Sequence, residues 1–354
     1  MHPSRQNWIY LGLLLTTGIN GAVAYAAISI LGWQPLAFYI SIGLSSLLLA
    51  LAFVWQSYDI KKFEQSNRQV SGNLQQALQQ LHEQRDVDHK ELQMARKVHE
   101  GLLSLSPPQI PGIAIASRCL PAQSLGGDFF AFLDRRGDGF IKKSPQVGIV
   151  EYRGKEETVL GVIVGDVAGH GVSSALVMAL SNGLMTEMSK NTKSPSHLLA
   201  QANERIHTYI RSSDIKYVTA FYGMLSVEAG LMRYAKAGHV CPFLQHADGS
   251  VVSLEVPGIF LGMYPGETYD EGEVQMAPGD RLVFFTDGIT EVRSGSGEMY
   301  GEERLTEALV QCRSMGAALA VDHIFNAIAE YSERRPARDD QTLIIIDYAG
   351  GTHD

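Results

Sequence analysis

Cysteine is scarce in this sequence and is not arranged as a covalent or metal-binding framework. Only three cysteines occur in 354 residues, at Cys119, Cys241 and Cys312, and none is paired with another at the short spacing of a zinc site. This excludes a disulfide-rich secreted domain and fits a reducing cytoplasm. We interpret all three as small buried residues.

Positive charge is also sparse. The chain carries 29 Lys and Arg against 38 Asp and Glu, a net charge of −9. It has no basic stripe and no basic patch interleaved with aromatic residues, so we expect no nucleic-acid partner. Three signatures of catalysis and phosphate binding are absent as well: Gly-x-Ser-x-Gly, a cysteine nucleophile pattern and a phosphate-binding Gly-x-x-x-x-Gly-Lys.

Charge of either sign is missing from residues 8–56. The apolar segments 8–32 and 35–55 are each about the twenty residues that cross a bilayer core, with aromatic residues near their ends. Only Trp33-Gln34 separates them, so residues 1–57 are predicted to form a transmembrane helical hairpin. The alternative for the first segment is a cleaved signal peptide. Its length and the second span that follows at once argue against that reading.

Basic residues flank the predicted hairpin on both sides. Arg5 precedes it and Lys61-Lys62 follow it, whereas the turn is uncharged. The positive-inside rule therefore predicts that both ends, and all of residues 58–354, lie in the cytoplasm.

Residues 58–105 are polar, rich in glutamine and free of proline. Apolar residues recur there at spacings of three, four and seven, at Phe63, Val70, Leu74, Ala77 and Leu81, and again at Leu92, Ala95, Val98 and Leu102. The pattern falters at Gln84 and Asp88. It predicts a parallel coiled coil in a homodimer with two packings of similar free energy. The alternative is a solvated linker helix without a partner.

The remaining segment, 106–354, has short apolar runs, glycine turns and a few helical patterns. Strands are expected at 113–118, 126–133, 146–150, 159–164, 219–226, 231–237, 281–285 and 343–348, and helices at 173–189, 197–211, 301–313 and 317–331. Because the helices do not alternate one for one with the strands, we predict an α+β fold with two sheets.

Four short acidic motifs lie in this segment, each at the end of an expected strand. They are Gly126-Gly127-Asp128, the run from Gly165-Asp166-Val167 to Gly171, Thr286-Asp287-Gly288 and Asp339-Asp340-Gln341-Thr342. Carboxylates gathered at strand ends repel one another and need neutralising. Two divalent cations bound by oxygen ligands do this and make a hydrolytic site for phosphoryl groups. We therefore expect water bound to metal, rather than a side chain, to attack the substrate.

Two histidines leave their roles open. His170 lies between glycines, and His239 follows Ala237-Gly238. Either is suited to protonate a leaving group or to orient water, and either is equally suited to pack with its ring bonded to the backbone. For His239 we favour the structural role.

These motifs occur in the order seen in a known family. The matching residues are Pro121-Ala122, Gly126-Gly127-Asp128, Gly165 to Gly171, Ala175, Met178, Asn203, Val218-Thr219, Ala237-Gly238-His239, Leu261-Gly262, Pro278-Gly279-Asp280, Thr286 to Glu291 and Asp339 to Thr342. Over about residues 95–349 the chain resembles the PPM-type metal-dependent serine/threonine phosphatases, and among them the bacterial SpoIIE/RsbU-like branch.

The resemblance implies a β-sandwich flanked by helices, with two Mn²⁺ or Mg²⁺ ions at one end. It implies that Asp128 holds one metal, that Asp166 bridges both and that Val167 offers its carbonyl. It also implies that Asp287 and Asp339 hold the other metal, with Asp340 in the neighbouring slot. Asp166 and Asp287 are the expected catalytic residues, acting through metal-bound water. One departure is Ala131, which stands where the family often has a second acid.

Two functions remain. The first is a membrane-anchored phosphoserine or phosphothreonine phosphatase of the bacterial inner membrane, multi-pass, with its catalytic domain in the cytoplasm. Its expected substrate is a phosphorylated regulatory protein such as an anti-sigma-factor antagonist. The alternative is a catalytically weak or inactive adaptor that uses the same fold to bind a partner protein. All the acid positions are occupied, which favours the enzyme.

Overall fold

The computed structural model describes residues 18–19, 21–23, 25–26, 29–30, 34–103, 107–136, 141–144, 148–151 and 158–351. The chain divides into two compact units, Met1–Asp88 and His89–Asp354. Most of the first predicted span, 8–32, lies outside the described residues. The division into three segments at residues 57 and 105 therefore remains a prediction.

The first unit contains most of helix α2, which runs from Gln34 to Leu103 without a break. The predicted second span, 35–55, and the predicted coil, 58–105, are thus parts of one helix up to Leu103. Within the described residues, α2 is the one helix long and apolar enough to cross a membrane. The two-helix hairpin is not shown, because its first helix is not described over its length.

The second unit is built from two five-stranded antiparallel sheets. The first sheet has the order β1 (Ile113–Leu120), β12 (Gln341–Tyr348), β11 (Arg281–Phe285), β8 (Phe243–Gln245) and β9 (Val251–Ser253). The second has the order β10 (Gly272–Gln275), β7 (Leu231–Ala237), β6 (Val218–Ser226), β5 (Thr158–Val167) and β2 (Phe129–Arg136). A separate hairpin pairs β3 (Ile141–Ser144) with β4 (Gly148–Glu151).

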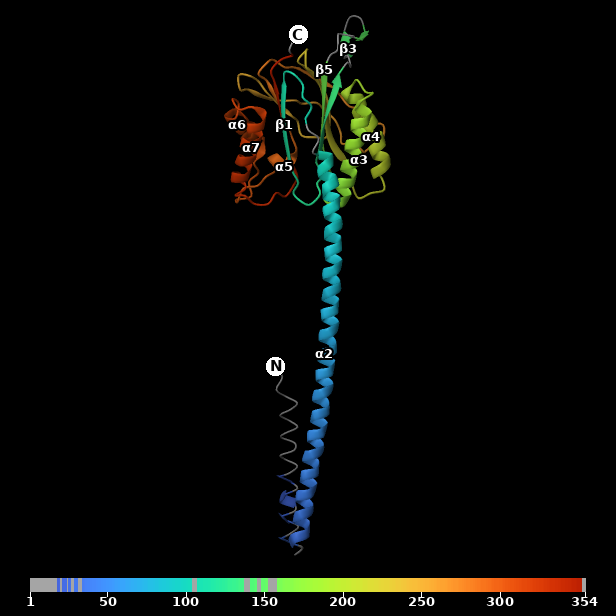
Figure 1. Cartoon of the computed structure of the whole chain (residues 1–354), viewed down its shortest axis with the longest axis vertical. Helices are drawn as coiled ribbons and strands as arrows, with labels where there is room; N and C mark the ends of the chain where they lie inside the picture. Colours follow the sequence, from blue (N-terminus) through green and yellow to red (C-terminus); the bar gives the residue numbers. More distant parts are fainter. Residues whose placement is uncertain are drawn as a thin grey trace. The chain divides into compact units, whose positions relative to one another are not determined.

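Helices cover the outer faces of the sandwich (Figure 1). They are α3 (Val172–Ser189) and α4 (Pro195–Ile210) on the second sheet, and α6 (Gly301–Gln311) and α7 (Ala317–Tyr331) on the first, with the short α5 (Asp287–Thr290) after β11. The predicted α+β class with two sheets is confirmed. Four short strands, β3, β8, β9 and β10, were not predicted.

Alternation along the strands explains these layers. Along β5, Val162 and Val164 pack between the sheets, whereas Ile163 packs against α3 and α4. Along β12, Ile344 and Ile346 enter the same middle layer, and Ile345 packs against the helices of the other face. Successive side chains of a strand point to opposite faces, and apolar side chains on both faces of each sheet are therefore buried. Each such side chain contributes roughly 1.5–3 kcal/mol to the free energy of unfolding.

Candidate active site

The sandwich brings the acidic motifs together from both sheets. In the second sheet, Asp128 directly precedes β2. Because Phe129 pairs with Gly165, Asp128 lies beside Asp166 on β5. In the first sheet, Asp287 follows β11 and Asp339-Asp340 precede β12. Phe285, the last residue of β11, pairs with Leu343 near the start of β12, so these acids lie at the same end of the sheet. All the predicted site residues therefore lie at one end of the sandwich.

Asp128 is buried and is held by the opposite sheet. Its Oδ2 accepts hydrogen bonds from Thr286 Oγ1 at 2.7 Å and from Thr342 Oγ1 at 2.6 Å. Burial, and then the charges of Asp166 and Asp340, raise the pKa of this carboxyl well above its usual value, although the two hydroxyls act against this. Asp128 thus links the sheets at the site.

Asp340 uses both carboxylate oxygens to hold the loop before β2. Oδ1 accepts from Ala122 N at 2.8 Å, and Oδ2 accepts from Gly127 N at 2.6 Å. The predicted strand 126–133 begins only at Phe129. Before it, the N–H of Gly127 bonds to the Asp340 side chain rather than to a neighbouring strand. The assignment of Asp340 as a metal ligand stays a prediction, and its bonds to the backbone explain its position without a metal.

Asp166 is affected by three neighbouring acids. Burial, and then the charges of Asp287, Asp339 and Asp340, raise its pKa to about 7. Burial also raises the pKa of Asp287, together with the charge of Glu291. For Asp339 the raised pKa comes from burial and from Asp287 and Asp340, while His170 acts in the opposite direction. Acids from both sheets thus disfavour one another's charged form.

The backbone around Val167 lies close to the loop that carries Asp128. Val167 donates its N–H to Gly127 O at 3.3 Å, and Val218, opposite it on β6, donates its N–H to Leu261 O. A β-carbon on Gly127 would lie 2.8 Å from Val167 O and 3.0 Å from Asp166 Oδ1. Only glycine permits this approach.

The donor set suits hard cations. It consists of carboxylates and one backbone carbonyl, the oxygen ligands that Mg²⁺ and Mn²⁺ prefer, with no thiolate. Among the described residues, no three His, Cys, Asp or Glu side chains already converge closely enough to hold a metal. The residues nevertheless fit a pair of cations, because bound positive charge would relieve the mutual repulsion of the carboxylates.

The two histidines occupy different surroundings. His170 is exposed at the start of the α3 region, near enough to Asp339 to affect its pKa. His239 is buried, and its Nδ1 lies 2.9 Å from Thr219 Oγ1. Ala131, at the position of the missing acid, is 1% exposed within the apolar layer under α3 and α4.

Several residues at the site had no predicted role. The hydroxyls of Thr219, Thr286 and Thr342 belong to motifs that the sequence displays, but their partners are 53 or more positions away in the chain. His99, near the end of α2, had no signal at all. Its Nε2 lies 3.0 Å from Gly126 O and 3.3 Å from Gly126 N, beside the Asp128 loop.

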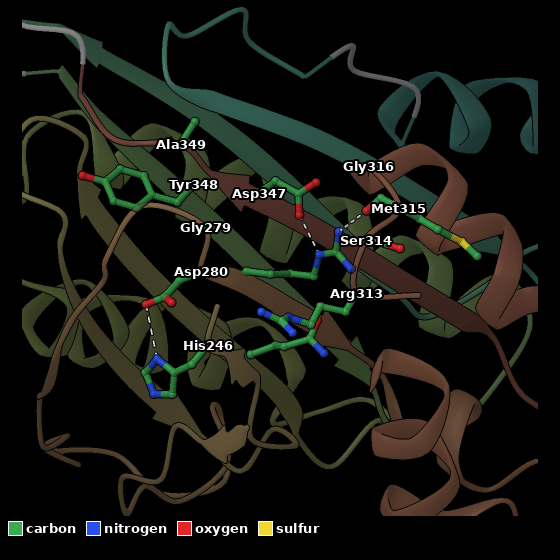
Figure 2. A pocket seen from close by; sticks show the side chains of 12 residues that line it. His246, Gly279, Asp280, Arg313, Ser314, Met315, Gly316, Asp347, Tyr348 and Ala349 are labelled. Atoms are coloured by element: carbon green, nitrogen blue, oxygen red, sulfur yellow. Dashed lines mark hydrogen bonds and ion pairs between the residues drawn. The ribbon is translucent and has the colours of Figure 1, made fainter. Parts of the chain in front are cut away.

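A cavity of about 470 Å³ lies elsewhere, where β11 begins and β12 ends (Figure 2). Two contacts between polar side chains line it: Arg281 Nε lies 2.6 Å from Asp347 Oδ1, and His246 Nδ1 lies 3.3 Å from Asp280 Oδ2. Because the acidic motifs follow the end of β11 and precede the start of β12, this cavity is at the opposite end of the strands from the site.

Comparison with known proteins agrees with this arrangement. The sequence model of the family "Stage II sporulation protein E (SpoIIE)" matches residues 156–349, more than half of the chain. The chain belongs to the SpoIIE family. Its predicted resemblance to the SpoIIE/RsbU-like branch is thereby confirmed.

Two curated relatives and one solved structure are similar over most of the chain. Protein IcfG of Synechocystis sp. is 26% identical over 95% of this chain, which spans only 55% of the length of IcfG. Phosphoserine phosphatase RsbU of Bacillus subtilis is 24% identical over 72% of this chain and 69% of its own. The SiaA-PP2C domain of Pseudomonas aeruginosa covers 75% of this chain and 98% of its own, with 21% identity and a TM-score of 0.60, and supports the fold.

Proposed function

We propose that this protein is a metal-dependent phosphatase that hydrolyses phosphoserine or phosphothreonine in a protein substrate. The observation that carries the proposal is the gathering of acids from both sheets, where burial and neighbouring carboxylates raise the pKa of Asp166 to about 7. Membership of the SpoIIE family and the phosphoserine phosphatase RsbU among its relatives support the same activity.

The roles of the residues follow from their contacts. Asp128, Asp166, Asp287, Asp339 and the Val167 carbonyl would hold two divalent cations, Mn²⁺ or Mg²⁺. When bound, the cations supply Lewis-acid polarisation of the phosphoryl group and a nucleophile derived from water. Asp128 stays within reach of Asp166 because two threonine hydroxyls fix one of its oxygens.

The substrate class is a phosphorylated regulatory protein such as an anti-sigma-factor antagonist. The alternative, an adaptor without activity, predicts no turnover in spite of the complete set of acids. Mn²⁺-dependent hydrolysis of para-nitrophenyl phosphate separates the two. To find the substrate, an Asp287→Asn variant is used to capture phosphorylated cytoplasmic proteins, and capture by the variant but not by a Glu303→Gln control identifies a candidate.

Anchoring in the bacterial inner membrane by two spans, 8–32 and 35–55, is part of the proposal. It is supported by the uncharged sequence of both segments and by the exposure of apolar side chains along α2, such as Phe53 at 71%. Reporter fusions after Trp33 and after Lys62 should report opposite sides of the membrane. Reports from the same side would contradict the hairpin.

We further propose that residues 58–105 pair in a homodimer and regulate the site. Apolar side chains of α2 are left uncovered in the single chain: Phe63 is 68% exposed, Val70 63% and Leu81 65%. At the end of the same helix, buried His99 contacts Gly126, two residues before Asp128. A change in helix packing therefore has a direct route to the loop that Asp340 also holds.

The interruption at Gln84 and Asp88 gives the test of this regulation. Changing both to leucine should lock the coil and fix activity high or low, independent of signal. A bias of about 1–3 kcal/mol corresponds to several-fold to a hundredfold. Leucine at Glu83 and Lys90, off the predicted seam, is the matched control. A dimeric Gln84/Asp88 variant with wild-type rates under every condition would reduce 58–105 to a tether.

A further inference from the structure

Thr219 holds the main chain of Asp166 in an unusual way. The two residues are directly opposite in the ladder between β5 and β6. The Thr219 hydroxyl accepts a hydrogen bond from Asp166 N at 3.1 Å and also lies 3.3 Å from Asp166 O. A single side-chain oxygen thus contacts both backbone polar groups of Asp166, so it fixes the point from which the carboxylate projects.

His239 lies behind this hydroxyl. Its Nδ1 is 2.9 Å from Thr219 Oγ1, and the ring is 5% exposed. Burial is the main cause that lowers the pKa of His239 to about 3. The backbone of Phe285 acts in the opposite direction and the charge of Lys236 in the same direction, and the ring is neutral. Nε2 has no hydrogen-bond partner within the described residues. The contact of Nδ1 with Thr219 is therefore the link between this ring and β6.

We infer that Thr219 and His239 form a brace that positions Asp166 for cation binding. An aspartate has only two side-chain torsions, so the place of its backbone largely decides where its oxygens lie. The charges of Asp287 and Asp339 act on Asp166 from the opposite sheet. Before a cation is bound, this repulsion pushes the carboxylate away, and a backbone held at both its N–H and its C=O resists the displacement.

The inference rests on the proposed function only in taking Asp166 as a cation ligand, and it assigns His239 a positioning role rather than that of a proton donor. The Thr219 hydroxyl is the side-chain partner of the ring in the described part of the chain, and the backbone of Phe285 also acts on the ring. The brace therefore predicts that removing His239 and removing the hydroxyl have overlapping effects, not additive ones.

The test measures Mn²⁺ binding by calorimetry on the full chain, with thermal unfolding recorded alongside. Thr219→Val keeps the side-chain shape and removes the hydroxyl, and it should weaken Mn²⁺ binding about tenfold or more. Thr219→Ser keeps the hydroxyl and should remain within about threefold of wild type. His239→Phe should weaken binding less than Thr219→Val, and the double variant should bind no more weakly than Thr219→Val alone.

The matched control is His207→Phe. The His207 ring also bonds through Nδ1, to Gly262 O at 2.8 Å, but it lies on α4 and contacts no site acid. It should bind Mn²⁺ as wild type does. Thr219→Val binding within twofold of wild type, or wild type that binds no Mn²⁺, overturns the inference, and fully additive losses in the double variant overturn the role of His239.

If Thr219→Val does not fold, His239→Phe and Thr219→Ser decide the matter: wild-type Mn²⁺ binding by His239→Phe, or a large loss in Thr219→Ser, contradicts the brace. Failure of the proposed function is distinguishable. Wild type that binds Mn²⁺ but leaves phosphoserine peptides intact refutes the phosphatase and leaves the brace standing.

Discussion

Replacing Asp340 and Asp339 separately by asparagine distinguishes two neighbouring acids that look alike in the sequence. Asp340 is 7% exposed, and its two oxygens accept from Ala122 N at 2.8 Å and Gly127 N at 2.6 Å. Asparagine offers only one acceptor and turns an NH₂ group toward the second N–H. Asp340→Asn therefore loses one charge-assisted hydrogen bond, weakens the other and leaves a buried donor without an acceptor.

The magnitude follows from these contacts. A hydrogen bond to a charged group contributes about 1.5–3 kcal/mol, and an unsatisfied buried donor costs about 1–3 kcal/mol. Relief of repulsion offsets part of this, because the charge of Asp340 raises the pKa of both Asp128 and Asp166. We expect the free energy of unfolding to fall by about 2–3 kcal/mol, which lowers Tm by about 4–12 °C for a domain of this size.

Asp339→Asn should behave in the opposite way. The Asp339 carboxylate accepts one hydrogen bond, from Asp340 N at 2.9 Å, and an asparagine oxygen can still accept it. Burial and the neighbouring acids raise the pKa of Asp339, so a neutral side chain at this position removes a buried charge and its repulsion with these acids. Tm without metal should stay the same or rise, whereas Mn²⁺ binding should weaken strongly. Thermal unfolding in chelator and Mn²⁺ calorimetry measure both. A stable Asp340→Asn variant beside an unstable Asp339→Asn variant would refute the assignment.

Two further predictions concern the same end of the sandwich. Asp166→Asn should reduce the Mn²⁺-dependent rate about a hundredfold or more, equivalent to about 2.7 kcal/mol or more, with the fold intact by circular dichroism; near-normal turnover would remove Asp166 from the site. Gly127→Ala should push the Asp128 loop away from Val167 and weaken Mn²⁺ binding at least tenfold, because the new β-carbon would lie 2.8 Å from the Val167 carbonyl. Gly183→Ala, where nothing lies within 4 Å, is its control and should leave binding unchanged.

Local pattern was sufficient for much of the fold. β7, β11 and α7 have the predicted bounds. β11 is an apolar run after its first residue, and the apolar residues of α7 recur at helical spacing. The three-residue strands β8 and β9 are too short to show alternation, and β10 has only Val274 as a large apolar residue. Such strands are set by the neighbours they pair with, which the local sequence does not display.

The candidate site was predictable in part. Acid at a strand end followed or preceded by glycine is a local feature, so Asp128, Asp166 and Asp287 could be singled out. The use of Asp340 by Ala122 depends on a contact across 218 positions, and the contact of His99 with Gly126 depends on how the end of α2 packs. Neither contact has a local signature, because aspartate and histidine are residue types usually found at exposed positions.

The measurement that tests the central claim most directly is hydrolysis of a phosphoserine peptide by the full chain, with and without Mn²⁺, beside its Asp287→Asn variant. Phosphate release should require Mn²⁺, cease on chelation, and fall about a hundredfold or more in the variant, for the loss of one ligand carboxylate. Release that persists in chelator, or that is equal in wild type and variant, would contradict a metal-dependent site at these acids. No release by wild type at any Mn²⁺ concentration would favour the adaptor.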